Sequence, residues 1–415
     1  MIGFISELLY RLIYPLLLIF HKRGGYTDEA IKLKKGYVDF SKDPNKKVIM
    51  FHGVSVGEIN AIEKLIRKAR ETFPDIKIVV TTGTNTGQEN AHKKLDEVAD
   101  LITYFPFDTP SCVKRYLNNI KPDLILVAET EIWPNIASEC KKRGIKLCII
   151  NGRISDRTYR SYKLLKFFFK PLLNNYAGIY TQSSEDLDKF ISLGTNPETT
   201  KRMNNLKFDI TAPEVTFNFD KSGTLLLAAS THSGEDQIVL SVYDRLKKSG
   251  KHNNLRLIIA PRHLNRRDEV ETLVGESGYT YGFRSENISS MADIDILILD
   301  TIGELGKMFA YTDISFIGGS FNKTGGHNPL ESIIFSKPVI SGPSIHNFKD
   351  IYSIIKNANA GFVVKTADEF YNIADKLLSD NKFYTETASA GCDVFKAQQG
   401  ALDYVLNIIK NELSV

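Results

Sequence analysis

Two series of short apolar segments, each alternating with amphipathic stretches, constrain the fold of this chain more than any other feature. Amphipathic helical periods separate the segments, as in residues 57–72 and 135–143. This alternation predicts parallel strands covered by helices on both faces. The sequence therefore predicts an α/β protein of two doubly wound domains that face a cleft, with ligands at the carboxyl ends of the strands. The predicted strands are residues 48–51, 76–81, 124–127 and 147–150 in the first series, and 225–229, 257–260, 296–299, 314–317 and 339–340 in the second.

The length of the chain agrees with two domains, because 415 residues exceed what a single core usually organises. Residues 212–223 lack a clear period and resemble a linker. The expected division is therefore an N-terminal segment at residues 1–23, a first domain at residues 24–211 and a second domain at residues 212–415. From about Asp368 onward the tail has a helical period.

Residues 1–23 form a distinct N-terminal segment. Residues 12–20 are apolar throughout, and Glu7 and Arg11 interrupt the apolar stretch before them. A spanning helix needs ~20 predominantly apolar residues, so the segment predicts a membrane-anchor helix, and whether it spans or lies in one leaflet stays open. The basic residues 21–23 favour a cytoplasmic location for the rest of the chain. A buried core helix and a cleaved signal peptide are the alternatives, although no small-residue cleavage site follows.

Charge and cysteine content narrow the function classes. The formal net charge is +4 and the pI is about 8.6, which does not by itself argue for nucleic acid, and no nucleic-acid partner is expected. The four cysteines have no Cys-x-x-Cys spacing and lie near no histidine cluster. Buried, reduced thiols are therefore expected, without zinc or disulfides.

A glycine-rich loop at residues 318–331 follows the apolar segment 314–317. Paired glycines let main-chain N–H groups approach an anion, and Pro329 is expected just inside a following helix. The loop has neither a Gly-x-Gly-x-x-Gly nor a Gly-Lys-Ser/Thr pattern. It predicts a nucleotide site in which Glu331 accepts hydrogen bonds from ribose hydroxyls. A simple tight turn is the alternative.

The segment 53–57 matches the Gly-x-Ser-x-Gly pattern of serine hydrolases, with Ser55 as the nucleophile. The pattern lies after the first predicted strand, which is early for a hydrolase. In the other interpretation the glycines make a strand-to-helix turn, and Glu58 begins the helix as a general base or as a cap.

Charged residues also follow other predicted strands. Glu129 and Glu131 come after the segment 124–127, and Arg262, a possible phosphate ligand, comes after 257–260. Asp293-Ile294-Asp295 precedes a strand, so it is interpreted as a solvated loop without a metal.

Basic residues recur at steps of three and four between residues 153 and 170, and a helix would place them on one stripe beside an apolar set. The stripe predicts either a solvated helix face or contact with an anionic, amphipathic partner. Its members are Arg153, Arg157, Arg160, Lys163, Lys166 and Lys170.

Taken together, these segments resemble, nearly from end to end, the bacterial transferases of 3-deoxy-D-manno-octulosonic acid (Kdo) that act on lipid A precursors. Small departures occur at Gly83, Asn85, Gly152 and Asn205, where the family more often has threonine, proline, alanine and glycine, respectively. The matching segments are residues 52–58, 104–108, 129–135, 205–209, 229–232, 261–263, 300–305, 318–331, 342–343 and 347–350.

The resemblance implies a GT-B fold of two Rossmann-like domains and an inverting enzyme that needs neither metal nor cofactor. It implies transfer of Kdo from CMP-Kdo to lipid IVA, a lipid A precursor, in lipopolysaccharide biosynthesis at the cytoplasmic side of the inner membrane. The first domain would bind the acceptor and the second the donor. The number of Kdo units added and the oligomeric state stay open.

By resemblance, Glu58 is the catalytic base, Glu129 and Lys207 stabilise the transition state, and Arg153, Arg157 and Arg160 are acceptor-side candidates. The remaining alternatives are a GT-B nucleotide-sugar enzyme of another class, the serine hydrolase and a non-catalytic lipid-binding module. The implied CMP contacts are Pro261, Arg262, Ile302, Gly303, Glu304, Asn328, Pro329, Leu330 and Glu331.

Overall fold

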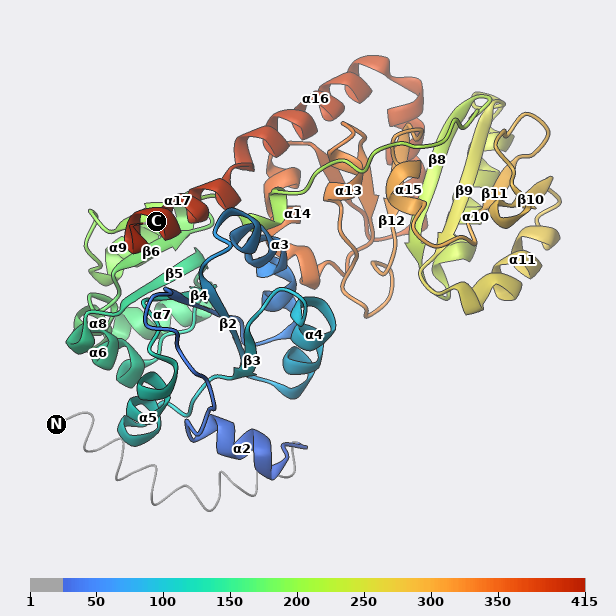
Figure 1. Cartoon of the computed structure of the whole chain (residues 1–415). Helices are drawn as coiled ribbons and strands as arrows, with labels where there is room; N and C mark the ends of the chain where they lie inside the picture. The colour runs from blue at the N-terminus through green and yellow to red at the C-terminus, as the bar shows by residue number, and fades with distance from the viewer. Residues whose placement is uncertain (1–24, 415) are drawn as a thin grey trace. The chain divides into compact units, whose positions relative to one another are not determined.

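The computed structural model describes residues 25–414, which fold into two units (Figure 1). One unit comprises Met1–Asp209 together with Gln399–Val415, and the other comprises Ile210–Gln398. The expected anchor at residues 1–23 lies outside the described residues. Among the residues that are described, no helix combines the length and the apolar character needed to cross a membrane.

The first unit is built on a seven-stranded parallel sheet of order β3-β2-β1-β4-β5-β6-β7. The strands are β1 (Val48–His52), β2 (Lys77–Thr82), β3 (Leu101–Tyr104), β4 (Leu124–Ala128), β5 (Lys146–Gly152), β6 (Gly178–Thr181) and β7 (Thr200–Arg202). The helices are α2 (Asp28–Lys34), α3 (Val56–Thr72), α4 (Asn85–Leu95), α5 (Pro110–Ile120), α6 (Pro134–Arg143), α7 (Asp156–Leu164), α8 (Lys166–Leu173), α9 (Ser184–Leu193), the 3-10 helix η1 (Leu206–Phe208) and α17 (Ala401–Leu413).

Alternate residues of the strands enter two separate cores. Ile49 and Phe51 of β1 pack with apolar residues of α3, α4 and α17 on one face of the sheet. Val48 and Met50 pack with residues of α5, α6, α8 and α9 on the other face. Because both faces are buried, every residue of β1 is buried, and polar groups with functional roles fall at the strand ends.

The second unit has a seven-stranded parallel sheet of order β10-β11-β9-β8-β12-β13-β14. The strands are β8 (Thr224–Thr231), β9 (Leu255–Pro261), β10 (Tyr281–Phe283), β11 (Ile296–Ile298), β12 (Ile314–Ile317), β13 (Val339–Ser341) and β14 (Gly361–Val363). The helices are α10 (Glu235–Lys248), α11 (Arg267–Glu276), α12 (Leu305–Met308), α13 (Leu330–Ile333), α14 (Lys349–Asn357), α15 (Ala367–Ser379) and α16 (Asn381–Gln398), with 3-10 helices η2 (Leu264–Arg266), η3 (Arg284–Glu286) and η4 (His346–Phe348).

The nine strands expected from the sequence are confirmed, and the five that it missed lie toward the sheet edges. These are β3, β6, β7, β10 and β14. β7 illustrates the reason: its residues Thr-Lys-Arg are mostly exposed, so they carry no apolar signal. The helical tail is confirmed as α15, α16 and α17.

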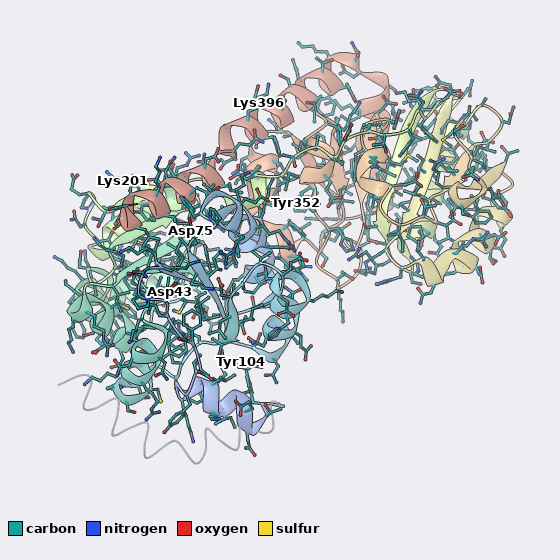
Figure 2. All side chains as sticks on the ribbon, viewed as in Figure 1. Asp43, Asp75, Tyr104, Lys201, Tyr352 and Lys396 are labelled. Carbon is teal, nitrogen blue, oxygen red and sulfur yellow. The ribbon has the colours of Figure 1, made fainter. Side chains whose placement is uncertain are left out.

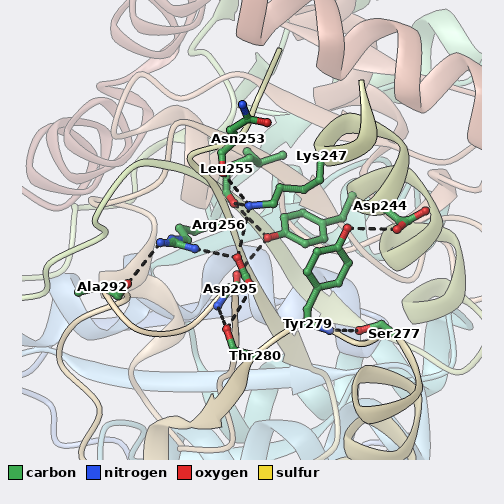
Figure 3. A network of polar contacts seen from close by, with 11 residues as sticks. Asp244, Lys247, Asn253, Leu255, Arg256, Ser277, Tyr279, Thr280, Ala292 and Asp295 are labelled. Carbon is green, nitrogen blue, oxygen red and sulfur yellow. Dashed lines mark hydrogen bonds and ion pairs between the residues drawn. The ribbon is translucent and has the colours of Figure 1, made fainter. Parts of the chain in front are cut away.

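Asp295 lies at the start of β11 and belongs to a polar network rather than to a solvated loop, which corrects the sequence interpretation (Figure 3). Its carboxylate accepts hydrogen bonds from Arg256 Nη1 at 2.8 Å and from Thr280 Oγ1 at 3.0 Å. The hydroxyl of Tyr243 donates to the Leu255 carbonyl oxygen at 3.0 Å nearby. Asp295 therefore stabilises the strand-start edge, opposite to the edge where the strands end, whereas Asp293 is exposed in the loop.

The spacing of the basic residues predicts one continuous helix, but the structure shows two. The helix is interrupted at Leu165, which ends α7 and precedes α8. Pro171 lies in α8, and an interior proline lacks the main-chain donor that a long helix needs. Arg153 precedes both helices, so Arg157, Arg160 and Lys163 are on α7, and Lys166 and Lys170 are on α8.

Helix α2 packs near the end of β3 through a buried lysine. Lys34 is 7% exposed, and its Nζ lies 5.1 Å from the ring centroid of Tyr104 and 4.9 Å from that of Tyr26. Figure 2 labels Tyr104, the last residue of β3. The same Nζ donates to the Gly83 carbonyl oxygen at 2.9 Å. Burial lowers the pKa of Lys34 to about 8.

The last helix belongs to the first unit, whereas the expected division placed residues 399–415 with the second domain. Asp209 explains the attachment, because its Oδ1 accepts from the Gly400 N–H at 2.7 Å and its Oδ2 from the Leu402 N–H at 2.5 Å. These N–H groups begin α17 and have no partner within the helix. Val405 and Ile409 then bury the apolar face of α17 in the first core.

We predict that Asp209→Ala lowers the free energy of unfolding by about 1–2 kcal/mol, because it removes the acceptor for two helix-start N–H groups. Urea denaturation followed by circular dichroism measures this loss. Asp403→Ala is the matched control, since Asp403 is exposed in the first turn of the same helix. Equal losses in the two variants would show that Asp209 does not anchor α17.

Candidate functional site

Glu58 lies at the first strand-to-helix turn of the first unit. It is the third residue of α3, and the turn brings its carboxylate back to accept a hydrogen bond from the Val54 main-chain N–H. Its side chain is half-buried. Burial and the nearby Glu129 carboxylate raise the pKa of Glu58, while main-chain N–H groups and Arg153 act in the opposite direction.

Glu129 follows β4 and has an unusual main-chain conformation. Its φ is 58°, in the left-handed region that residues with side chains rarely adopt. Its N–H donates to the Ile150 carbonyl oxygen of β5 at 2.9 Å, which holds this conformation. Strained residues of this kind gather at functional sites. Glu129 Oε2 accepts from Arg153 Nε at 2.8 Å, and only 13% of the Glu129 side chain is exposed.

Glu131 adds a third carboxyl group, which the sequence analysis noted without giving it a role. Burial, Glu58 and Glu129 together raise the pKa of Glu131 to about 7. The pKa values of Glu58 and Glu131 are therefore both raised, and the Glu129 carboxylate contributes to each rise. Arg153 is the cation that pairs with these carboxyl groups, so the acceptor-side candidate Arg153 lies beside the candidate base.

The turn that carries Glu58 is supported from the side of α2. The Val54 carbonyl oxygen accepts the N–H groups of Gly83 at 3.0 Å and Thr84 at 3.1 Å. Lys34 holds the Gly83 carbonyl oxygen, as described above. A Cβ at Gly83 would lie 2.6 Å from a Val54 side-chain carbon, so only glycine allows this approach. Gly83, where the family more often has threonine, is therefore compatible with this turn.

Lys207 lies in η1, which two asparagines hold in place. Asn205 Oδ1 accepts from the Lys207 N–H at 3.0 Å, and Asn151 Oδ1 of β5 accepts from the Leu206 N–H at 3.0 Å. Asn205 is buried, and its Nδ2 donates to Gln182 Oε1 at 2.9 Å. These bonds fix the main chain of Lys207 near the carboxyl end of β5, the strand that Arg153 follows.

The hydrolase pattern lacks a base for its serine. Ser55 is the residue that precedes α3, and within residues 25–414 no histidine hydrogen-bonds to it. The neighbouring His52 is 1% exposed, and its Nδ1 lies 2.9 Å from Thr81 Oγ1. Burial lowers the pKa of His52 to about 3, so it is a neutral core residue.

In the second unit, the implied CMP-contacting residues fall into two groups. Arg262 follows β9 and is exposed, and its charge acts on Glu331 of α13. Burial raises the pKa of Glu331, and Asn328 and Arg262 oppose the rise. Pro261, Asn328, Pro329 and Leu330 are close in sequence to these two charged residues.

Residues 302–304 form the other group. Ile302 is 87% exposed, and Gly303 has a φ of 85°. Glu304 is already paired, because Arg284 Nη2 donates to Glu304 Oε1 at 2.7 Å. The side chain of Ile302 and the main chain of this turn are therefore its available surfaces.

The glycine loop differs from the expected phosphate cradle. A buried carboxylate, Glu235, already accepts its main-chain N–H groups: Oε2 from Gly319 at 2.7 Å, and Oε1 from Ser320 and Phe321 at 2.8 Å each. Glu235 Oε2 also accepts from the His232 N–H at 2.9 Å. Glu235 thus joins the turn after β8 to the loop after β12 from inside.

The helix after the loop also differs from expectation. Helix α13 has four residues, and Pro329 is its N-cap rather than an inner residue. A helix this short gives little dipole, so an anion at this edge depends on side chains.

A metal site is not formed by the described side chains. Between residues 25 and 414, no group of three or more histidine, cysteine, aspartate or glutamate side chains is arranged to hold a metal ion.

Two functional residues were missed or left without a role. Glu235 follows His232 by three residues and bonds back to its N–H, which is the spacing of a capping box and could have indicated a local partner. Nothing in that spacing indicates the three loop N–H groups some 85 residues away. Glu131 was visible as a strand-end carboxylate, but its raised pKa depends on neighbours that only the fold brings together.

Comparison with solved structures shows the fold. A structure titled UDP-N-acetylglucosamine 2-epimerase is similar with a TM-score of 0.55 and 12% sequence identity, over 87% of this chain and 95% of that chain. At this identity the likeness concerns the two-sheet GT-B type of fold alone.

Sequence comparison shows the family. The family model described as 3-deoxy-D-manno-octulosonic-acid transferase (kdotransferase) matches residues 28–210. A bifunctional glycosyltransferase/methyltransferase of Fusobacterium nucleatum is 34% identical over 90% of this chain, but the chain spans only 60% of that protein. The 3-deoxy-D-manno-octulosonic acid transferase of Haemophilus influenzae is 32% identical over 90% of this chain and 89% of its own length. The chain therefore belongs to the family of 3-deoxy-D-manno-octulosonic acid transferases.

Proposed function

We propose that this protein transfers Kdo from CMP-Kdo to a lipid A precursor such as lipid IVA, with inversion at the anomeric carbon and without a metal. The observation that carries the proposal is Glu58, a half-buried carboxylate with a raised pKa at the first strand-to-helix turn of a chain in the Kdo transferase family. A base is what this transfer requires, because the acceptor hydroxyl must lose a proton as it attacks.

The electrostatics around Glu58 suit a general base. A base is most effective when its pKa lies near the working pH, and burial and Glu129 raise the pKa of Glu58 in that direction. The main-chain N–H groups of Val54 and Ser55 oppose this rise in pKa, and the bond from Val54 fixes the position of the carboxylate. Glu58 therefore takes the acceptor proton in this proposal.

Glu129 and Lys207 are proposed to stabilise charge in the transition state. Positive charge develops on the sugar as CMP leaves, and an ionised Glu129 lowers its energy. Lys207 balances negative charge on the departing phosphate. Arg153 orients the Glu129 side chain through their 2.8 Å contact.

The donor site is proposed in the second unit, on Arg262 for the phosphate and on Glu331 for the ribose. Arg262 directly follows β9, Glu331 lies in α13 after β12 of the same sheet, and Arg262 acts electrostatically on Glu331. Residues 302–304 are proposed to contact the cytosine. CMP carries a single phosphate, so one arginine and neighbouring side chains can balance its charge without a metal.

The acceptor and the membrane are proposed to meet the α7–α8 corner. Leu164 is 82% exposed and Phe167 is 80% exposed, and basic residues of both helices flank them. Exposed apolar side chains within a basic surface suit an anionic, amphipathic lipid. We propose that this corner, together with an anchor at residues 1–23, holds the protein at the cytoplasmic side of the inner membrane.

We predict that Glu58→Gln abolishes transfer, because the amide cannot accept the proton, and base catalysis typically contributes 10²–10⁴-fold. Rates are measured with purified protein, CMP-Kdo and detergent-dispersed acceptor, and CMP affinity by calorimetry stays unchanged. Ser55→Ala is the control and should retain activity. A dead Ser55→Ala variant beside an active Glu58→Gln variant would support the hydrolase instead.

We predict opposite pH shifts for two variants. As the base, Glu58 must be deprotonated, so kcat/KM rises with pH through its raised pKa. Glu129→Gln removes a negative neighbour and moves this acid limb to lower pH, whereas Arg153→Gln removes a positive neighbour and moves it to higher pH. Profiles of kcat/KM against pH measure both. Shifts in the same direction would mean that Glu58 does not set the limb.

We predict that reversing Arg157 and Arg160 to glutamate raises the acceptor KM roughly tenfold or more and leaves the CMP-Kdo KM nearly unchanged. Each basic residue near an anionic surface contributes ~1 kcal/mol, and the effect should shrink at high salt. Reversal of Lys141 and Lys142 on α6 is the control for net charge. An equal effect of the two pairs would locate the acceptor elsewhere.

A further inference from the structure

Three histidines gather where the central strands of the second unit end. His232 follows β8, His263 follows β9, and His327 lies in the glycine loop after β12. The Nε2 atoms of His232 and His327 are 2.9 Å apart, and their rings are nearly parallel, with an interplanar angle of 9°. The His263 ring stands perpendicular to that of His232, with centroids 5.7 Å apart.

The loop is shaped to admit this pair. Gly319 has a φ of 67°, and a Cβ there would lie 3.0 Å from a ring carbon of His327. Any larger residue would push the imidazole away, so the glycine gives His327 its place over the loop. The contact between the two histidines therefore depends on the shape of the loop at Gly319.

The contact between the two Nε2 atoms defines a protonation state. One nitrogen must donate a hydrogen and the other must accept it, so the two rings cannot both be imidazolium in this geometry. Burial, together with the charges of His232, Arg262 and His263, lowers the pKa of His327 to about 4. Burial also lowers the pKa of His232. At neutral pH the pair is therefore uncharged.

Of the charged groups around the histidine pair, some have hydrogen-bond or ion-pair partners and others do not. Glu235 faces His232 but is bound by four main-chain N–H groups, and Arg266 is paired with Asp236 and Glu269. Arg262 acts on both histidines, and within residues 25–414 its guanidinium makes no hydrogen bond or ion pair. Arg262 also acts electrostatically on the carboxyl group of Glu331, which lies in α13.

An anion at this edge therefore has to rely in part on side chains. The N–H groups of Gly319, Ser320 and Phe321 are occupied by Glu235 and cannot bind it. We propose that His232 and His327, beside Arg262, receive the phosphate of the nucleotide, and that the pair takes up a proton when the phosphate binds. The proposal rests on the proposed function for the identity of the nucleotide.

The direction of the proton movement follows from charge. A phosphate dianion within hydrogen-bonding distance favours the imidazolium form, so it raises the histidine pKa values from their lowered positions. Between the lowered and the raised pKa, binding draws a proton from solution. Affinity for the phosphate-bearing ligand consequently increases as the pH falls through this window.

Titration calorimetry of CMP binding tests the proposal. Binding is measured at several pH values between about 6 and 8 in two buffers of different ionisation enthalpy, and the proton that the phosphate of CMP itself exchanges is subtracted. A difference in apparent enthalpy that scales with the buffer reports proton uptake. We expect uptake for CMP and none for cytidine, which has the same base and ribose but no phosphate.

Variants locate the proton. His327→Gln and His232→Gln should each abolish the buffer dependence and weaken CMP binding about tenfold or more, while cytidine binding stays unchanged and thermal unfolding confirms the fold. His346→Gln is the matched control, because His346 is exposed beside Gly325 of the same loop. Its proton uptake should equal that of the parent protein.

The outcomes distinguish the role of the histidine pair from the assignment of the donor site. Tight CMP binding without proton uptake, or with uptake retained in both pair variants, overturns the role of the histidine pair and leaves the proposed function intact. If neither CMP nor cytidine binds to the folded parent protein, the donor assignment itself fails, and the histidine role fails with it.

Discussion

Burial of a parallel sheet on both faces is the constraint on which the rest of this structure depends. In each unit the central strands are buried on both sides, so a side chain along their length cannot reach a ligand. All strands of a sheet run the same way, and their carboxyl ends meet at one edge. Glu58, Glu129 and Arg153 in the first unit, and His232, Arg262 and His327 in the second, are all placed by this geometry.

Two glutamates at equivalent turns show how hydrogen bonding separates reactivity from structure. Glu58 follows the first strand of one sheet, and Glu235 follows the first strand of the other. Glu235 is 1% exposed and accepts four main-chain N–H groups, which leaves its oxygens no capacity for chemistry. Glu58 is half-buried beside the carboxylate of Glu129, which raises its pKa. One carboxylate holds loops together, and the other is suited to take a proton.

The sequence was sufficient for the central strands and for the strand-end charges, because apolar runs followed by charged residues are local signals. It failed where the signal is not local. The edge strand β7 carries no apolar run, and the attachment of α17 depends on Asp209, some 190 residues away. The glycine loop was interpreted as a phosphate cradle because its composition fits one, and only the fold reveals that Glu235 already occupies its N–H groups. The left-handed conformation of Glu129 likewise depends on its bond to β5.

Mass spectrometry of the reaction product tests the central claim most directly. Purified protein is incubated with CMP-Kdo and a lipid A precursor, and the lipid and nucleotide products are analysed together. The account predicts a lipid whose mass increases by whole Kdo units, with one free CMP released for each unit added. Hydrolysis of CMP-Kdo to free Kdo with an unmodified lipid, or an unchanged donor, would contradict it.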